Sequence, residues 1–238
     1  MLLKTRERVK KWIAMLGLLS AEFIIIIVVF TISLIAFSYL VKQIFVDHQQ
    51  AFDFKVFHWL AGHVTPFHTS TMEAITFLGT HIFLIPANLV LTAYFLFIKK
   101  HRWYSIKVAA IALSSTAMMF LLKNIFSRHR PLIPLLKPAL GYSFPSGHSM
   151  MSFSFYGLLI YLCYKYIENK FLKWFLMTGL FLLILSIGFS RIYLRVHYAS
   201  DVLAGFSVGI AWLIFSIWLL NKIESYSRRN LKSIKDVE

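Results

Sequence analysis

The sequence is poor in cysteine and in acidic side chains. Cys163 is the single cysteine among 238 residues, so no disulfide bond can form within the chain. Asn169 stands six positions later, where a cysteine-phosphatase loop would carry an arginine. The 10 aspartates and glutamates are dispersed, and no acidic cluster is available to hold a divalent cation. We therefore expect no disulfide bond, no cysteine nucleophile, no metal and no cofactor.

Charged residues of either sign are also few. Only 15% of the residues are charged and 58% are hydrophobic, whereas soluble domains carry about 25% and about 45–50%. The apolar excess comes in blocks of about 20 residues, long enough for a helix to cross a ~30 Å hydrocarbon core. The predicted fold class is therefore all-α, a polytopic membrane helix bundle. We expect one integral membrane domain over residues 1–238.

The apolar runs predict about six transmembrane helices. They cover residues 23–44, 72–98, 105–126, 147–167, 174–189 and 198–220. Residues 1–22 are predicted to form a basic interfacial segment that leads into the first helix. Residues 45–70 predict an outer interfacial segment, since part of it has one apolar face. Residues 221–238 predict a flexible, basic cytoplasmic tail.

The 25 lysines and arginines give a formal net charge of +15. They cluster at the ends of the apolar runs, as topology signals do, which argues against a nucleic-acid partner. Four segments are basic: both termini, the 99–102 loop and the 168–173 turn. The positive-inside rule places them on the cytoplasmic side of the membrane. The membrane is expected to be a bacterial inner (plasma) membrane. The loops 127–146 and 190–197 then face outward although they are basic too. Cations retained on that side need another reason, and a bound anion supplies one.

A short polar break separates the third apolar run from the fourth. It reads G-Y-S-F-P-S-G-H-S-M over residues 141–150. We expect a new helix to begin at Gly147, with His148 in its first turn. The backbone N–H groups of Ser146 and Gly147 then lie at the positive end of the helix dipole, which is a ready anion site. Many helices begin with Ser-Gly and bind nothing, so this signal is weak alone.

Two partner segments make the signal specific. One precedes the break and reads K-N-I-F-S-R-H-R-P from Lys123 to Pro131; the other follows it and reads S-R-I-Y-L-R-V-H-Y-A-S-D from Ser190 to Asp201. The three segments resemble the signature motifs of the type 2 phosphatidic acid phosphatase family, shared with vanadium haloperoxidases: K-x6-R-P, P-S-G-H and S-R-x5-H-x3-D. All defining positions match in order. The resemblance covers a catalytic core at residues 105–220 firmly, and the first two spans loosely.

The residue types suit phosphoryl transfer, which needs positioned positive charge, an in-line nucleophile and a proton for the leaving oxygen. Lys123, Arg130 and Arg191 supply charge, and the planar guanidinium forks match phosphate oxygens. The N–H groups of Ser146 and Gly147 would hold a further oxygen, and the Ser146 hydroxyl would add a donor. We predict these five as phosphate-binding residues. Any single cation among them is equally compatible with a headgroup anchor.

Two histidines are predicted to divide the catalytic work. Asp201 follows His197 by four positions, so on one helix face its carboxylate can accept a ring N–H and stabilise the imidazolium. That arrangement suits a nucleophile, whereas His148 suits a general acid for the leaving alkoxide. The resemblance implies the same roles: a phosphohistidine at His197, hydrolysed by water, with no divalent metal.

Residues near the motifs receive other interpretations. Arg128, His129 and Arg195 are interpreted as loop or rim residues outside the site. Gly205 and Gly209 continue the four-residue spacing of His197 and Asp201 along the last helix. A pair of small residues at this spacing predicts close helix packing in a membrane.

Together these features predict an integral membrane phosphatase with its active site at the outer ends of the later spans. The expected partners are the bilayer and a phosphorylated lipid whose monoester or pyrophosphate is hydrolysed. Phosphatidic acid, phosphatidylglycerol phosphate, polyprenyl pyrophosphate and lipid A phosphate all fit, and the motifs set no oligomeric state. Two alternatives are a lipid phosphotransferase using the same site and a non-enzymatic anion transporter. The apolar centres of the spans disfavour the transporter.

Overall fold

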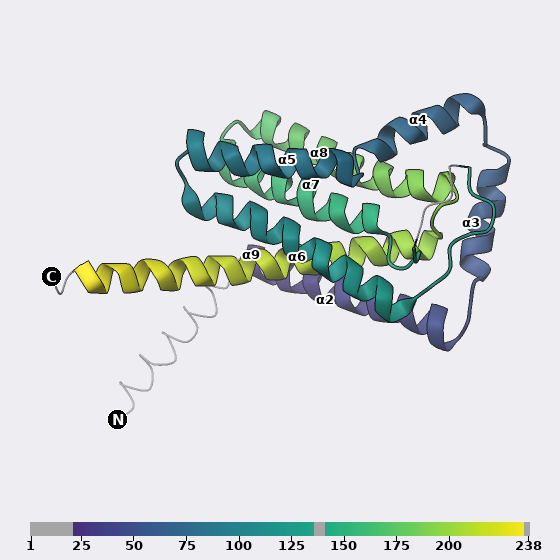
Figure 1. Cartoon of the computed structure of the whole chain (residues 1–238), viewed down its shortest axis with the longest axis horizontal. Coiled ribbons are helices and arrows are strands. Elements are labelled where there is room, and N and C mark those ends of the chain that lie inside the picture. Colours follow the sequence, from purple (N-terminus) through teal and green to yellow (C-terminus); the bar gives the residue numbers. More distant parts are fainter. Residues whose placement is uncertain (1–20, 136–140, 236–238) are drawn as a thin grey trace.

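The computed structural model of the chain describes residues 21–135 and 141–235, and its regular elements in these ranges are helices (Figure 1). In chain order they are α2 (Ala21–Val41), η1 (Lys42–Val46), α3 (Ala51–Ala61), α4 (Pro66–Phe77), α5 (His81–Ala93), η2 (Tyr94–Ile98), α6 (Arg102–Phe126), α7 (Gly147–Tyr166), α8 (Lys170–Tyr193) and α9 (Ala199–Lys235). The predicted all-α class is confirmed. Residues 1–20 of the basic lead-in, and Lys137, lie outside the described ranges.

Five segments of the described chain are long and apolar enough to cross a membrane: Phe23–Val46, Pro66–Ile98, Arg102–Phe126, Lys170–Tyr193 and Ala199–Arg229. They correspond to five of the six predicted runs. The remaining run forms α7, which packs against α6, α8 and α9 inside the bundle (Figure 1). Its Ser149, Ser152 and Ser154 are buried. These side chains lower the hydropathy of α7 because it faces other helices, where small polar residues pack well.

The second predicted span consists of two helices. α4 begins at Pro66, earlier than expected, because Thr65 caps it by accepting an N–H group from the first turn. The helix is interrupted near Gly79, and the Thr80 side chain caps the start of α5 in the same way. The predicted outer segment 45–70 therefore ends before α4, and its last residues belong to a candidate span.

The prediction of a flexible tail is wrong for residues 221–235. There α9 continues as a helix through Lys235. The reason is visible on α6, where the buried Lys107 Nζ donates to Asn221 Oδ1 and to Glu224 Oε2, both at 2.6 Å. A buried ammonium held by an amide and a carboxylate fixes the extension of α9 to the bundle.

α7 and α9 approach each other closely through glycines of α9. A Cβ atom added at Gly205 would lie 2.6 Å from the Ser146 carbonyl oxygen, and one at Gly209 would lie 3.2 Å from the Met150 carbonyl oxygen. Only a residue without a side chain fits at Gly205. The predicted small-residue packing face is confirmed, and it brings the start of α7 against the first turns of α9.

α3 lies across the end of the bundle at which the motif loops gather (Figure 1). It packs against α8 and α9. Leu60 is 2% exposed, in a cluster with Tyr193, Leu194 and Val196, while the opposite face leaves Trp59 exposed. The segment predicted as interfacial is thus a cap with one buried face.

Candidate active site

The three motif segments meet at the end of the bundle covered by α3. The backbone N–H of Ser146 donates to the carbonyl of Asp201 at 2.9 Å, which joins the start of α7 to the start of α9. The N–H of Ser143 donates to the carbonyl of Arg128 at 2.8 Å, which joins the break to the loop after α6. Ser127 ends α6 in the left-handed conformation, φ 45°, and turns the chain toward this junction.

His197 and Arg130 are in direct contact. Arg130 Nη1 lies 3.2 Å from His197 Nε2 and donates to the Val196 carbonyl at 2.8 Å, while its Nε donates to the Gly141 carbonyl at 2.9 Å. His197 is 2% exposed. The guanidinium plane is therefore held beside a buried imidazole by two backbone carbonyls.

The other ring nitrogen of His197 faces Asp201. His197 Nδ1 lies 3.5 Å from Asp201 Oδ2, somewhat beyond an ordinary hydrogen bond. Both residues are buried. The prediction that both lie on one helix face is wrong, because α9 begins at Ala199 and His197 stands in the turn before it; this turn brings the imidazole beside the carboxylate.

Electrostatics favour a neutral imidazole at His197. Burial lowers the pKa of His197 well below its ordinary value, and Arg130, Arg191 and Lys123 lower it further. Each of these cations repels the imidazolium, and the buried ring cannot be stabilised by water. A neutral ring keeps a lone pair at physiological pH, which a nucleophile requires.

The remaining predicted cations approach from two other helices. Lys123 Nζ, near the end of α6, donates to the Tyr142 carbonyl at 2.5 Å. Arg191 Nη1, near the end of α8, donates to Thr76 Oγ1 at 2.8 Å, and both side chains are buried. Thr76 on α4 carries no motif, and sequence reasoning missed it.

The start of α7 supplies the third side of the cluster. Ser146 is the N-cap, and its side-chain oxygen accepts the N–H of Ser149 at 3.4 Å. The Ser146 side-chain oxygen thus acts as the acceptor of the cap, and the Ser146 N–H, predicted to bind phosphate, instead donates to the Asp201 carbonyl. A Cβ atom at Gly147 would lie 2.6 Å from Met119 Sδ, so α6 packs directly on this turn.

His148 lies in the first turn of α7, as predicted. Its Nε2 atom is buried and has no hydrogen-bond partner among the described residues. The ring is within electrostatic reach of Arg191, His197 and Arg130. A Cβ atom at Gly79 would lie 3.2 Å from His148 Cδ2, so the break between α4 and α5 packs on the imidazole. The structure therefore brings all eight predicted site residues to one region.

The interpretation of Arg128 as a rim residue is wrong. Arg128 is 8% exposed, and its guanidinium donates to Asp201 Oδ1 at 2.6 Å and to Asp53 Oδ2 at 2.8 Å. His129 is exposed and Arg195 is half-buried. Asp53 was missed because α3 has no motif. The sequence signal for Asp53 was its position between two phenylalanines. A carboxylate buried with such neighbours would need a partner, because an unpaired buried charge is costly.

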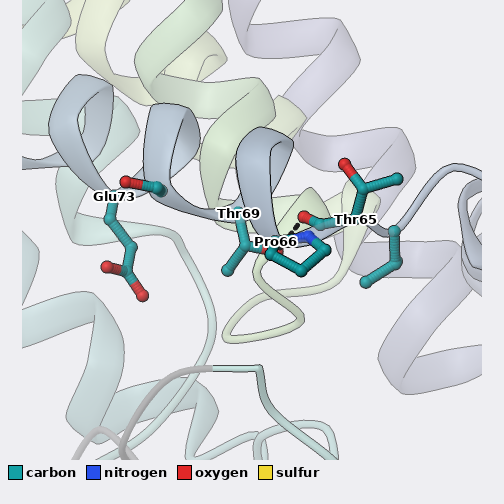
Figure 2. Close-up of a pocket in the computed structure, with 6 residues that line it drawn as sticks. Thr65, Pro66, Thr69 and Glu73 are labelled. Atoms are coloured by element: carbon teal, nitrogen blue, oxygen red, sulfur yellow. Dashed lines mark hydrogen bonds between the residues drawn. The ribbon is translucent and has the colours of Figure 1, made fainter.

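Two open pockets border α4. The larger, about 440 Å³, is lined by Val64, Thr65, Pro66, Thr69, Ser70 and Glu73 (Figure 2). The smaller, about 210 Å³, lies between α4 and α8 and is lined by Met72, Ile75, Leu185, Ser186 and Phe189. Neither lining contains a predicted site residue. The smaller pocket reaches Ile75, the neighbour of Thr76.

A membrane helix bundle that gathers three cations and two imidazoles at its helix ends has the equipment of a phosphate-handling membrane enzyme. Comparison with known proteins agrees. Residues 103–225 match the PAP2 superfamily. Phosphatidylglycerophosphatase B of Bacillus subtilis is 32% identical over 148 residues, 61% of this chain and 71% of that protein. Dolichyldiphosphatase 1 of Dictyostelium discoideum is 27% identical over 151 residues, 62% of this chain and 66% of its own length.

A solved structure gives the same result for the fold. The crystal structure of a transmembrane PAP2-type phosphatidylglycerolphosphate phosphatase from Bacillus subtilis matches with a TM-score of 0.74 and 26% identity, covering 82% of this chain and 96% of that one. The chain therefore belongs to the PAP2 superfamily and is a membrane lipid phosphate phosphatase. The resemblance read from the three motifs is confirmed. The family match begins after α3 and α4, so Asp53 and Thr76 lie outside it.

Proposed function

We propose that the chain hydrolyses phosphate monoesters or pyrophosphates of membrane lipids through a phosphohistidine intermediate at His197, without a metal. The observation that carries this proposal is the buried His197 ring, which has Arg130 3.2 Å from one nitrogen and Asp201 3.5 Å from the other. An in-line attack needs such a neutral, oriented nucleophile beside the charge that binds the phosphate.

In the first step, His197 Nε2 attacks phosphorus and forms an N–P bond while the bond to the leaving oxygen breaks. Lys123, Arg130 and Arg191 bind the phosphate oxygens, and the N–H group of Gly147 at the start of α7 stabilises the developing charge. His148 gives a proton to the leaving alkoxide. Asp201 accepts the His197 Nδ1 proton as a hydrogen bond and stabilises positive charge on the ring.

In the second step, a water molecule replaces the alcohol. His148, now deprotonated, takes a proton from the water as its oxygen attacks phosphorus and the N–P bond breaks. Inorganic phosphate leaves and both histidines return to their starting states. The same residue serves as acid and then as base, as microscopic reversibility requires.

We also propose that α7 crosses the membrane with the five candidate spans. Its 20 residues match the length that the hydrocarbon core demands. The connections α5–α6 and α7–α8 and the far end of α9 lie together, opposite α3 (Figure 1). These connections are basic, which favours a cytoplasmic location for this end of the bundle. The end that carries the site would then lie at the outer face of the membrane.

The proposed substrate class is a phosphorylated lipid that reaches the site from the bilayer. The relatives are named for a phosphatidylglycerol phosphate and a dolichyl diphosphate, so monoesters and pyrophosphates both fall within the proposed class. Relatives alone do not select among phosphatidic acid, phosphatidylglycerol phosphate, polyprenyl pyrophosphate and lipid A phosphate.

A panel of these four lipids tests the proposal. Purified protein in detergent is expected to release inorganic phosphate from at least one of them, at an unchanged rate with EDTA and at a reduced rate with vanadate. The His197→Ala variant is the matched control for contaminating phosphatases. Release of phosphate from none of the four lipids, or equal release by His197→Ala, would overturn the proposed function.

A further inference from the structure

A buried ion-pair chain links α3 to the first turn of α9. Arg128 lies between two carboxylates: Nη2 donates to Asp53 Oδ2 at 2.8 Å, and Nη1 donates to Asp201 Oδ1 at 2.6 Å. Asp53 is 1% exposed and Asp201 is fully buried. Charges so removed from water are kept only where each has its partner, because an unpaired buried charge is strongly destabilising.

Asp53 also serves the start of α9 directly. Its Oδ1 accepts the backbone N–H of Ser200 at 2.9 Å, and its Oδ2 accepts the Ser200 hydroxyl proton at 2.6 Å. Helix N-termini have unpaired N–H groups and a positive dipole end, and a carboxylate satisfies both. Asp53 therefore caps α9 from another helix, and α3 holds the turn that carries Asp201.

Arg128 fixes the orientation of the Asp201 carboxylate. It occupies Oδ1, while the backbone N–H of Tyr198 donates to Oδ2 at 2.9 Å. Oδ2 is the oxygen that faces His197 Nδ1. The Arg128 guanidinium also lies 4.1 Å from the centre of the Tyr198 ring, a cation–π contact that stabilises this position.

We propose that Asp53 and Arg128 are positioning residues of the phosphatase site. They hold Asp201 so that one carboxylate oxygen faces His197 Nδ1, and they act through Asp201 and not on the substrate. This inference rests on the function proposed above. Because Asp53 lies outside residues 103–225, α3 adds an element of the site that the family segment does not contain.

The charge balance around His197 gives a signature of this role. The groups that face the ring are Asp201, three cations (Lys123, Arg130 and Arg191) and His148. In the wild type, Arg128 is shared by two carboxylates. Without the Asp53 charge, Arg128 is balanced by Asp201 alone, so the carboxylate attracts the imidazolium less. The imidazole is then expected to stay neutral to lower pH.

The first test uses Asp53→Asn in the full-length protein, with the panel lipid that the wild type hydrolyses fastest. Asparagine keeps the shape and an oxygen for the Ser200 N–H, but loses the charge. We expect kcat to fall roughly tenfold or more, the scale of one charge-assisted hydrogen bond, with KM within about twofold. The acid limb of kcat against pH is expected to move to lower pH.

The second test separates positioning from stability. Arg128→Lys keeps a cation beside Asp53 and Asp201, so no buried carboxylate loses its positive charge and thermal stability is expected to stay near that of the wild type. kcat is expected to fall, because an ammonium lacks the planar fork that bonds to both carboxylates and orients Asp201. The matched control is Lys107→Met with Glu224→Gln, a buried ion pair at the other end of α9. It is expected to lower stability without moving the acid limb.

The outcomes are distinct. If Arg128→Lys is stable and keeps the wild-type kcat, or if Asp53→Asn leaves kcat and the acid limb unchanged, the inference is wrong while the phosphatase stands. If Asp53→Asn does not fold, Arg128→Lys decides. If the wild type releases phosphate from none of the lipids, the proposed function fails first and the inference falls with it.

Discussion

The two ring nitrogens of His197 have different neighbours, and these neighbours favour one position for its proton. Arg130 has only N–H donors, so Nε2, 3.2 Å away, is the accepting nitrogen. The proton is therefore on Nδ1, which faces the Asp201 carboxylate. This is the tautomer in which Nε2 carries the lone pair that the proposed mechanism uses.

The two histidines are expected to respond differently to the leaving group. His197→Ala should abolish phosphate release from a lipid phosphate and from p-nitrophenyl phosphate, because both need the nucleophile. His148→Ala should lose roughly 10²–10⁴-fold with the lipid, whose alkoxide must be protonated, and far less with p-nitrophenyl phosphate. The measurement is kcat/KM for each variant on both substrates. Equal losses on the two substrates would refute the general-acid role of His148.

The cations and histidines of the motifs could be named from sequence because the three segments, taken in order, match the motifs of a known family. Arg128 could not be placed, although it lies two residues from Arg130. The direction of its side chain depends on the left-handed turn at Ser127 and on Asp53, 75 residues earlier. Spacing carries no information about a partner on another helix, so the pairing of Asp53 with Arg128 required the fold.

At the scale of elements, the site depends on how closely α7 approaches α9. A Cβ atom at Gly205 would meet the Ser146 carbonyl oxygen at 2.6 Å and Ser149 Cβ at 2.9 Å. Both atoms belong to the turn at the start of α7, which carries the proposed phosphate-binding backbone. A backbone atom cannot move aside as a flexible side chain can, so the helices must separate.

Gly205→Ala is therefore expected to destabilise the protein by about 1–3 kcal/mol, the usual cost of overpacking. It should also lower kcat, because His148 moves with α7 while His197 stays with α9. Gly179→Ala on α8 is the control, since nothing lies within 4 Å of its added Cβ atom. Thermal unfolding and phosphate release measure both effects. Wild-type activity in Gly205→Ala would mean that the contact does not set the geometry of the site.

The spans could be located from apolar runs, but the ends of the elements could not. The second run was expected to form one helix, yet Gly79 and Thr80 divide it into α4 and α5. Hydropathy does not register a helix cap inside an apolar stretch. The break has a consequence for the site, because it lets Thr76 reach Arg191 and Gly79 contact His148. The α9 extension was missed for a similar reason, since its anchor is Lys107 on another helix.

At the scale of the whole molecule, positive charge occurs at both ends of the bundle but in different settings. At the end that carries α3, the arginines of the motifs are paired with carboxylates, backbone carbonyls and Thr76. At the opposite end, exposed lysines stand in or next to short connections: Lys99 follows η2, and Lys170 begins α8. We propose that Arg130 and Arg191 of the first set bind an anion and that the second set is a signal of membrane topology.

The orientation can be tested with the single cysteine removed. In a Cys163→Ser background, Leu132→Cys introduces a thiol at a 96% exposed position in the loop after α6. Glu168→Cys introduces one at the exposed α7–α8 turn without removing a cation. A membrane-impermeant maleimide applied to intact cells is expected to label Leu132→Cys alone, and to label both after permeabilisation. The background variant should take no label. Labelling of Glu168→Cys alone in intact cells would place the site on the cytoplasmic face, where the arginines of the motifs would simply follow the positive-inside rule and would need no bound anion to explain them.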